Sequence, residues 1–158
     1  WPIMNEQKYG RIVLTSSGSG IYGNFGQANY GAAKMGMLGL MNVLALEGAR
    51  NNIRTNVLAP GAATRMISTI PGRDIDPNDP PPESSPSLVS PAVLFMTSEN
   101  APNATVINAS GGKYSRAQMY VNKPINLGVG TEFEDLQAEA ETLMDLSTAK
   151  PRETGRQS

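Results

Sequence analysis

Residues 10–61 decide the fold and read GRIVLTSSGSGIYGNFGQANYGAAKMGMLGLMNVLALEGARNNIRTNVLAPG. Residues 11–15 are an apolar run without helical periodicity, which is typical of a strand buried on both faces. Residues 28–50 are apolar nearly all round, which predicts a long buried helix whose small residues let another element pack closely. Residues 53–59 predict a second strand, ended by Pro60-Gly61. Strand, helix and strand in this order form a right-handed crossover, so the chain is predicted to contain a parallel sheet.

Shorter elements follow in the second half of the chain. Seven of the twelve prolines lie between residues 71 and 91, so this stretch is predicted to leave the body of the fold as an irregular, mobile excursion. Residues 87–98 predict a short helix, and residues 104–108 predict a third strand closed by Gly111-Gly112. Together these elements predict an α/β fold with helices packed on a parallel sheet.

The tail of the chain has a helical pattern of its own. Thr131 is followed three residues later by Glu134, which is the pattern of a capping box, and acidic residues in a first turn suit the helix dipole. One narrow apolar face would be formed by Phe133, Leu136, Ala140 and Leu143. We therefore expect one acidic helix that docks on the body of the protein or on a partner.

The composition excludes several kinds of chemistry. The 158 residues include no cysteine and no histidine, so these residues form no disulfide framework, thiolate nucleophile, imidazole metal site or Ser-His-Asp triad. Acid–base chemistry must use tyrosine, lysine or carboxylates. The net charge is −1 and the basic residues are scattered, unlike the basic stripe of a nucleic-acid-binding protein. No apolar stretch is long enough for a membrane span. We expect a cytoplasmic protein without metal, nucleic-acid or membrane partners.

A glycine-rich motif follows the first predicted strand. Residues 18–23, GSGIYG, match G-x-G-x-x-G, the pattern of a dinucleotide-binding turn. That turn also requires a helix opening at the glycines and a carboxylate at the end of the next strand, about 20 residues on. Here the glycines continue through Gly26, and the second strand ends in Ala59-Pro60. We therefore interpret residues 16–27 as a loop over a cleft, not as a nucleotide-binding turn.

Tyr30 and Lys34 form a candidate catalytic pair. On a helix they lie one turn apart on one face. The reference pKa of a tyrosine is about 10, and an ammonium held beside a phenolate stabilises the charged form, which brings proton exchange closer to neutral pH. Taken alone, the spacing is also that of an ordinary pair on a helix surface. Ser16 and Ser17 end the first strand at the carboxyl edge, where parallel sheets bind ligands, so Ser17 could bind a substrate oxygen that Tyr30 protonates.

These residues carry a family resemblance. Residues 10–34, GRIVLTSSGSGIYGNFGQANYGAAK, with NVLAPGAATRM at 56–66, resemble the short-chain dehydrogenase/reductase family. Within it they are most similar to the (3R)-hydroxyacyl-CoA dehydrogenase part of peroxisomal multifunctional β-oxidation enzymes and to bacterial relatives. The resemblance covers about residues 9–112, since the serine, Tyr-x-x-x-Lys, the second strand and Pro-Gly follow the family's order and spacing. It implies a Rossmann-like, three-layer parallel sheet, with only its C-terminal half present.

The resemblance implies a role for each matching residue. Ser17 would orient the substrate carbonyl or hydroxyl, Tyr30 would donate or accept the proton, and Lys34 would favour the Tyr30 phenolate and hold the nicotinamide ribose. The cofactor-binding set would be Tyr30, Lys34, Pro60, Gly61, Ala63 and Thr64. The proline-rich segment after Met66 occupies the place of the family's substrate loop. These roles imply an NAD- or NADP-dependent oxidoreductase that interconverts a hydroxyl and a carbonyl. By resemblance alone, the substrate is a 3-hydroxyacyl or 3-oxoacyl thioester.

The sequence departs from the family pattern in its nucleotide-binding part. The motif Thr-Gly-x-x-x-Gly-x-Gly and the segment Asn-Asn-Ala-Gly do not occur in it, and the fourth catalytic residue, an asparagine, would precede Trp1. We expect residues 1–112 to be a partial catalytic domain without its nucleotide-binding half, and residues 113–158 to be an extension with one acidic helix. The first strand would then be an exposed sheet edge, which promotes association and lowers stability.

The sequence is therefore compatible with two functions. One is the oxidoreductase, for which the resemblance also implies a homo-oligomer, because the long helix lies at a subunit interface in the family. Its location would be cytoplasmic, with the peroxisome left open. The other is a truncated, inactive half-domain that serves as a binding or interaction module.

Overall fold

The computed structural model describes residues 1–68, 76, 79 and 81–154. The chain divides into two compact units, of which the first includes residues 1–117 and Thr154 and the second is Gln118–Glu153. The first unit contains the sheet and all the predicted site residues. Within the described residues, no helix combines the length and the apolar character needed to cross a bilayer.

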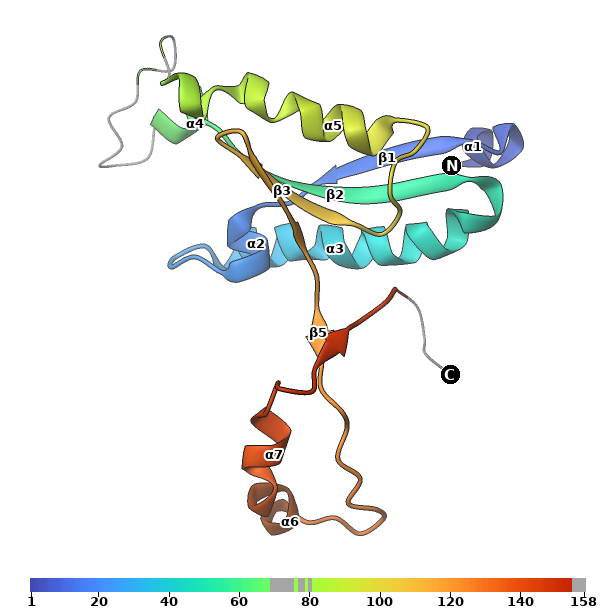
Figure 1. The fold of residues 1–158 in the computed structure, drawn as a ribbon, viewed down its shortest axis with the longest axis vertical. Coiled ribbons are helices and arrows are strands. Elements are labelled where there is room, and N and C mark those ends of the chain that lie inside the picture. The colour runs from blue at the N-terminus through green and yellow to red at the C-terminus, as the bar shows by residue number, and fades with distance from the viewer. Residues whose placement is uncertain (69–75, 77–78, 80, 155–158) are drawn as a thin grey trace. The chain divides into compact units, whose positions relative to one another are not determined.

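The first unit is built on a four-stranded sheet in the order β1-β2-β3-β4. Its strands are β1 (Gly10–Thr15), β2 (Ile53–Gly61), β3 (Val106–Ser110) and β4 (Lys113–Ala117). The first three strands are parallel, and β4 is antiparallel to β3. The helices α3 (Ala28–Gly48) and α5 (Ser90–Thr97) lie on opposite faces of this sheet (Figure 1). The predicted three-layer, Rossmann-like α/β fold is therefore confirmed.

Short helices connect these elements. They are α1 (Pro2–Gln7), α2 (Gly18–Tyr22), α4 (Arg65–Ser68) and the 3-10 turns Ala49–Asn51, Pro82–Ser84 and Pro86–Leu88. Within the proline-rich stretch, residues 69–75, 77–78 and 80 lie outside the described residues, and with them the predicted mobile excursion and most of the expected substrate loop. The predicted helix at 87–98 is confirmed as α5 and the turn before it.

β2 extends further than predicted, because Pro60 and Gly61 belong to the strand. Proline has no backbone N–H to donate to a neighbouring strand. β1 pairs with β2 only as far as Thr15, which lies opposite Leu58. On the other side, Pro60 still lies opposite Ala109 of β3. A proline is tolerated here because the strand that would need its N–H has already ended.

The sheet has a separate hydrophobic core on each face. On the α3 side the buried core is formed by Leu38, Met41, Val57 and Val106. On the α5 side it is formed by Leu58, Ala92, Met96 and Ala109. Neighbouring residues of one strand enter different cores because side chains alternate between the two faces of a sheet. This alternation fixes which residues of each strand face α3, and the site depends on it.

The long helix α3 is buried on one face only. Its buried residues are Leu38, Met41, Ala45 and Gly48, whereas Leu40, Val43 and Leu46 are about half exposed. The prediction of a helix buried all round is therefore wrong for this chain. The physical reason is that the sheet covers only the face that carries Leu38 and Met41.

The glycines of α3 differ in what surrounds them, which gives a matched pair of substitutions. A Cβ at Gly39 would meet nothing within 4 Å, whereas a Cβ at Gly48 would lie 2.8 Å from both the Cβ and the carbonyl oxygen of Ile53. Gly39→Ala is expected to raise the free energy of unfolding by about 0.5–1 kcal/mol through helix propensity, and Gly48→Ala to lower it by about 1–3 kcal/mol through overpacking. Urea denaturation followed by circular dichroism measures both; equal shifts in the two variants would contradict this account.

β4 was not predicted, and it adds an antiparallel strand to the sheet. Gly111 and Gly112 have φ angles of +57° and +70°, which glycine adopts at little cost and which form a tight two-residue turn. The chain therefore reverses at the two glycines, and the sheet continues through Ala117.

The second unit contains β5 (Tyr120–Val121), α6 (Phe133–Ala138), α7 (Ala140–Met144) and β6 (Lys150–Pro151), with β5 and β6 paired antiparallel. The prediction of one helix capped by Thr131 and Glu134 is wrong. The capping box is formed one residue later, by Glu132 and Asp135, and the helix breaks at Glu139. The Thr131 hydroxyl instead donates to the carbonyl oxygen of Gly128, and the Glu132 side chain accepts from the first turn of the helix.

Candidate functional site

The three predicted catalytic residues lie near the carboxyl end of β1. Ser17 is the N-cap of α2, with its Oγ accepting a hydrogen bond of 3.2 Å from the backbone N–H of Ser19. Tyr30 and Lys34 lie on the first two turns of α3. In a parallel sheet the carboxyl edge is where ligands bind.

The glycine-rich segment that follows β1 is a helix, so the prediction of a loop over residues 16–27 is wrong for residues 18–22. Its position depends on Gly20: a Cβ there would lie 2.7 Å from the Cβ of Lys34 and 3.0 Å from the backbone nitrogen of Met35. Only glycine allows α2 to approach α3 so closely. The Ser17 cap and this packing compensate for the low helix propensity of the glycines.

Lys34 is held to the end of β1 at two points. The hydroxyl of Ser16 donates to the backbone carbonyl of Lys34 over 2.8 Å, and the Lys34 ammonium donates to the carbonyl of Thr15 over 3.1 Å. Ser16 is buried. Its anchoring role was not predicted, and the only indication in the sequence is the Ser-Ser pair at the strand end. These contacts place the Lys34 side chain at the carboxyl edge of the sheet.

Tyr30 and Lys34 are also in direct contact with each other. The Lys34 Nζ lies 5.7 Å from the centroid of the Tyr30 ring, a distance at which a cation is attracted to an aromatic ring. The Tyr30 side chain is 42% exposed, and its hydroxyl makes no hydrogen bond with any residue that the structure describes. The pair therefore combines a partly exposed phenol with a positive charge held over its ring.

The four predicted cofactor residues beyond this pair differ in their surroundings. Pro60 and Gly61 end β2 at the same edge of the sheet as Thr15. Ala63 is buried, and its N–H donates to the carbonyl of Ser84 over 2.8 Å. Thr64 is exposed, and its carbonyl accepts from Ile67 at the start of α4. Pro60, Gly61 and Thr64 can therefore offer groups to a ligand, while the Ala63 N–H is already bonded.

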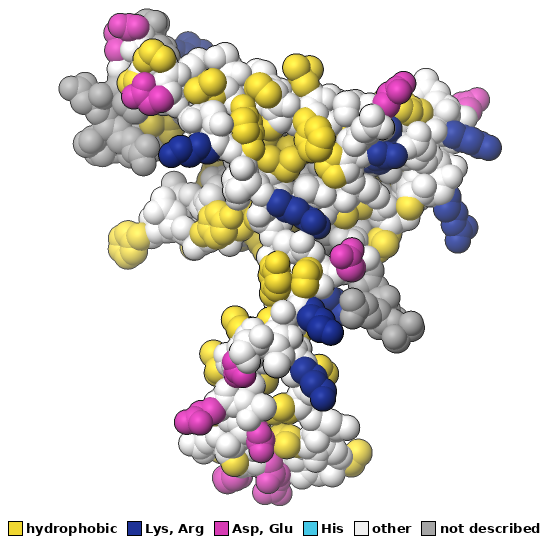
Figure 2. All heavy atoms as spheres, viewed as in Figure 1, with side chains coloured by type: hydrophobic (Ala, Val, Ile, Leu, Met, Phe, Trp, Pro, Cys, Tyr) yellow, Lys and Arg dark blue, Asp and Glu magenta, His cyan; other side chains and the backbone are white. Residues whose placement is uncertain are grey.

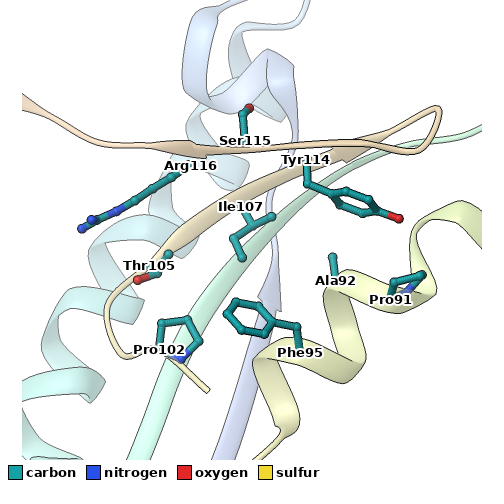
Figure 3. A pocket seen from close by; sticks show the side chains of 9 residues that line it. All are labelled: Pro91, Ala92, Phe95, Pro102, Thr105, Ile107, Tyr114, Ser115 and Arg116. Carbon is teal, nitrogen blue, oxygen red and sulfur yellow. The ribbon is translucent and has the colours of Figure 1, made fainter. Parts of the chain in front are cut away.

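An apolar cavity of about 540 Å³ lies on the opposite face of the sheet, between α5 and the β3–β4 hairpin. Figure 3 shows Phe95 and Ala92 of α5 facing Ile107 of β3, with the Tyr114 ring beside them. Hydrophobic side chains also gather on the surface over α5 (Figure 2), where Leu94 and Phe95 are exposed. This cavity lies on the face away from α3 and so apart from Tyr30 and Lys34.

Comparison with known proteins shows which proteins this chain is similar to. Residues 1–71 match the family model of the short chain dehydrogenases. The chain is 46% identical over 151 residues to a short-chain type dehydrogenase/reductase of Mycobacterium tuberculosis, covering 95% of this chain and 51% of the relative. It is 41% identical over 123 residues to acetoacetyl-CoA reductase of Acinetobacter sp., covering 72% and 50%. The structure of full-length peroxisomal multifunctional enzyme type 2 from Drosophila melanogaster matches with a TM-score of 0.77 and 38% identity, covering 94% of this chain and 27% of that one.

The chain spans about half the length of the two curated relatives. In this chain Ser17, Tyr30 and Lys34 lie between the parallel strands β1 and β2. Three findings agree: the fold, the match of residues 1–71 to the family model, and the sequence identity to these relatives. The chain belongs to the short-chain dehydrogenase/reductase family.

Proposed function

We propose that the chain supplies the catalytic residues of a nicotinamide-dependent oxidoreductase that interconverts a hydroxyl and a carbonyl. The observation that supports this most is the partly exposed Tyr30, whose ring centroid lies 5.7 Å from the anchored ammonium of Lys34, at the carboxyl edge of the sheet. Tyr30 would then give a proton to a substrate oxygen, or take one from it, according to the direction of the reaction.

The other residues of the site would bind and orient. Ser17 would hold the substrate oxygen through its hydroxyl, which already accepts from Ser19 and keeps its own proton to donate. Lys34 has three N–H groups, one of which is donated to Thr15, so the others suit the hydroxyl groups of a ribose. NAD or NADP, when bound, supplies the hydride acceptor or donor. Pro60, Gly61 and Thr64 would lie against its nicotinamide end.

For the substrate we propose a 3-hydroxyacyl or 3-oxoacyl thioester. The support is the identity to an acetoacetyl-CoA reductase and the structural likeness to a peroxisomal multifunctional enzyme. We also propose that the active protein is a homo-oligomer in which the exposed apolar face of α3, with Leu40, Val43 and Leu46, is covered by another subunit. Burying such a face removes apolar surface from water.

Isothermal titration of the full chain with NADH and with NADPH tests the proposed function. We expect a dissociation constant on the order of micromolar for one of the two cofactors, and oxidation of that cofactor when acetoacetyl-CoA is added. A chain that is folded by circular dichroism and binds neither cofactor would contradict the proposal and support the alternative, an inactive interaction module. Sedimentation velocity on the same samples measures the oligomeric state.

A further inference from the structure

Four polar side chains gather on one face of the β3–β4 hairpin. Asn108 lies opposite Ser115, and Ser110 lies opposite Lys113; we call these four residues the polar quartet. They share the face that carries α3, because Val106 belongs to the core under α3 and alternate residues of a strand point the same way. Figure 3 accordingly shows Ser115 pointing away from the apolar residues Ile107 and Phe95. Along β3 this face changes from apolar to polar towards the carboxyl edge.

The polar quartet lines a cavity of about 500 Å³. The other lining residues are Glu83, Gly111 and Tyr114. A cavity of this size falls within the range of small-ligand sites. Apart from the Tyr114 hydroxyl, which donates to the carbonyl of Leu88, its polar side chains are one amide, two serine hydroxyls and two groups of opposite charge. Together they suit a ligand that is neutral and rich in hydrogen-bonding groups.

Two contacts connect this cavity with the candidate site. The amide nitrogen of Asn108 donates to the hydroxyl of Tyr22 over 2.9 Å, and Tyr22 is the last residue of α2, the helix that Ser17 caps. Ser110 lies opposite Gly61 at the end of β2, and a Cβ on Gly61 would lie 2.6 Å from the Ser110 hydroxyl oxygen. The cavity therefore adjoins both α2 and the end of β2, the two elements that carry Ser17 and the Pro60-Gly61 pair.

We propose that this cavity binds the pantetheine arm of an acyl thioester, an inference that rests on the proposed function. The arm is a flexible, uncharged chain with two amides and a hydroxyl. The Asn108 amide nitrogen already donates to Tyr22 and to Ser115, so the groups left for the arm are the Asn108 amide oxygen, the two serine hydroxyl protons and the Lys113 ammonium. A phosphate or other anion would face the carboxylate of Glu83 as well as the ammonium of Lys113. A purely apolar acyl chain would use none of the hydrogen-bonding groups that line this cavity, so it matches the lining less well.

Titration of the isotope-labelled full chain with D-pantetheine, followed through its backbone amide resonances, tests the inference. We expect the amides of Gly111, Lys113 and Ser115 to shift with a dissociation constant on the order of 1 mM, while those of Tyr120 and Val121 stay in place. The double variant Lys113→Ala/Ser115→Ala is expected to weaken binding by about fivefold or more. Arg116→Ala is the matched control, because it removes one positive charge from the opposite face of the same strand.

Coenzyme A and a phosphopantetheinylated carrier protein both carry this arm, so each is titrated separately. Shifts of the same amides by either one support the inference and identify which carries the arm to the protein. The inference is overturned if pantetheine, coenzyme A and the carrier protein all leave these amides unmoved, or if the double variant binds pantetheine as tightly as the unaltered chain. The readout needs neither cofactor nor turnover, so a chain that fails to bind NADH still reports on the cavity.

Discussion

Replacing Tyr30 by phenylalanine is expected to lower kcat by a factor of about 10²–10⁴, which is the contribution typical of a positioned general acid or base. The substitution removes only the hydroxyl of a partly exposed residue and leaves the ring that lies near the Lys34 ammonium. The ring stays in place, so the packing of α3 and the binding of cofactor are expected to change little. The measurement is the rate of NADH oxidation with acetoacetyl-CoA, together with the cofactor dissociation constant.

Tyr9→Phe is the matched control for this experiment. Tyr9 is 42% exposed, as Tyr30 is, and it also has a cation over its ring, with the Arg11 guanidinium 4.3 Å from the centroid. It precedes the amino end of β1, however, at the opposite edge of the sheet. Tyr9→Phe should therefore keep full activity. If Tyr30→Phe were as active as Tyr9→Phe, the proton-transfer role of Tyr30 would be refuted.

The largest effect on stability is expected for Asn56→Ala, which should lower the free energy of unfolding by about 3 kcal/mol. Asn56 is fully buried in β2. Its side-chain amide donates to the carbonyl of Pro102 over 2.8 Å and accepts from the N–H of Thr105 over 3.1 Å. Truncation leaves both backbone groups without that partner, and each unsatisfied buried group costs about 1–3 kcal/mol.

Urea denaturation measures this loss, and Asn24→Ala serves as its control. Asn24 is exposed and makes one surface hydrogen bond, of 3.1 Å to the Gln27 side chain. Its replacement should change the free energy of unfolding by no more than about 0.5 kcal/mol. A similar loss in both variants would show that the two hydrogen bonds of Asn56 do not hold the segment between α5 and β3 onto β2.

The parallel part of the fold was predictable because it depends on long apolar runs. Residues 12–14 and 57–59 are apolar without interruption, as expected for strands covered on both faces, and the long helix between the two strands is typical of a crossover connection. β4 was missed because Gly111-Gly112 was interpreted as the end of a strand. The same glycine pair is also the sequence pattern of a two-residue hairpin turn, and the polar residues after it gave no apolar alternation to follow.

The short helix α2 was missed for a different reason. Three glycines between residues 18 and 23 argue against a helix by propensity, and the compensating contact is tertiary: Gly20 packs on Lys34. Gly20 and Lys34 are fourteen positions apart, and the sequence between them does not show that the chain turns back to bring them together. The burial of α3 was overestimated for a related reason. An apolar helix surface indicates that another element can pack on it, but it does not show which part of the protein, or which partner, does so.

Ser17, Tyr30 and Lys34 could be predicted as candidates from residue types, spacing and the family resemblance, whereas the polar quartet could not. Asn108 and Ser115 come together only through the register of a strand that the sequence did not predict. Asn and Ser are also common at protein surfaces, so neither residue alone indicates a binding site. Polar groups from a hairpin become a candidate site only once the pairing is known.

Lys34 is hydrogen-bonded through both its backbone carbonyl and its ammonium, so the length of its side chain matters as well as its charge. Its backbone is fastened to Ser16 and its tip to Thr15, so the side chain acts as a spacer between helix and strand. Arginine would preserve the positive charge, but its planar, longer tip presents several donors in a fixed fork and does not span the gap in the same way. A Lys34→Arg substitution would therefore keep the positive charge but not the geometry of this side chain.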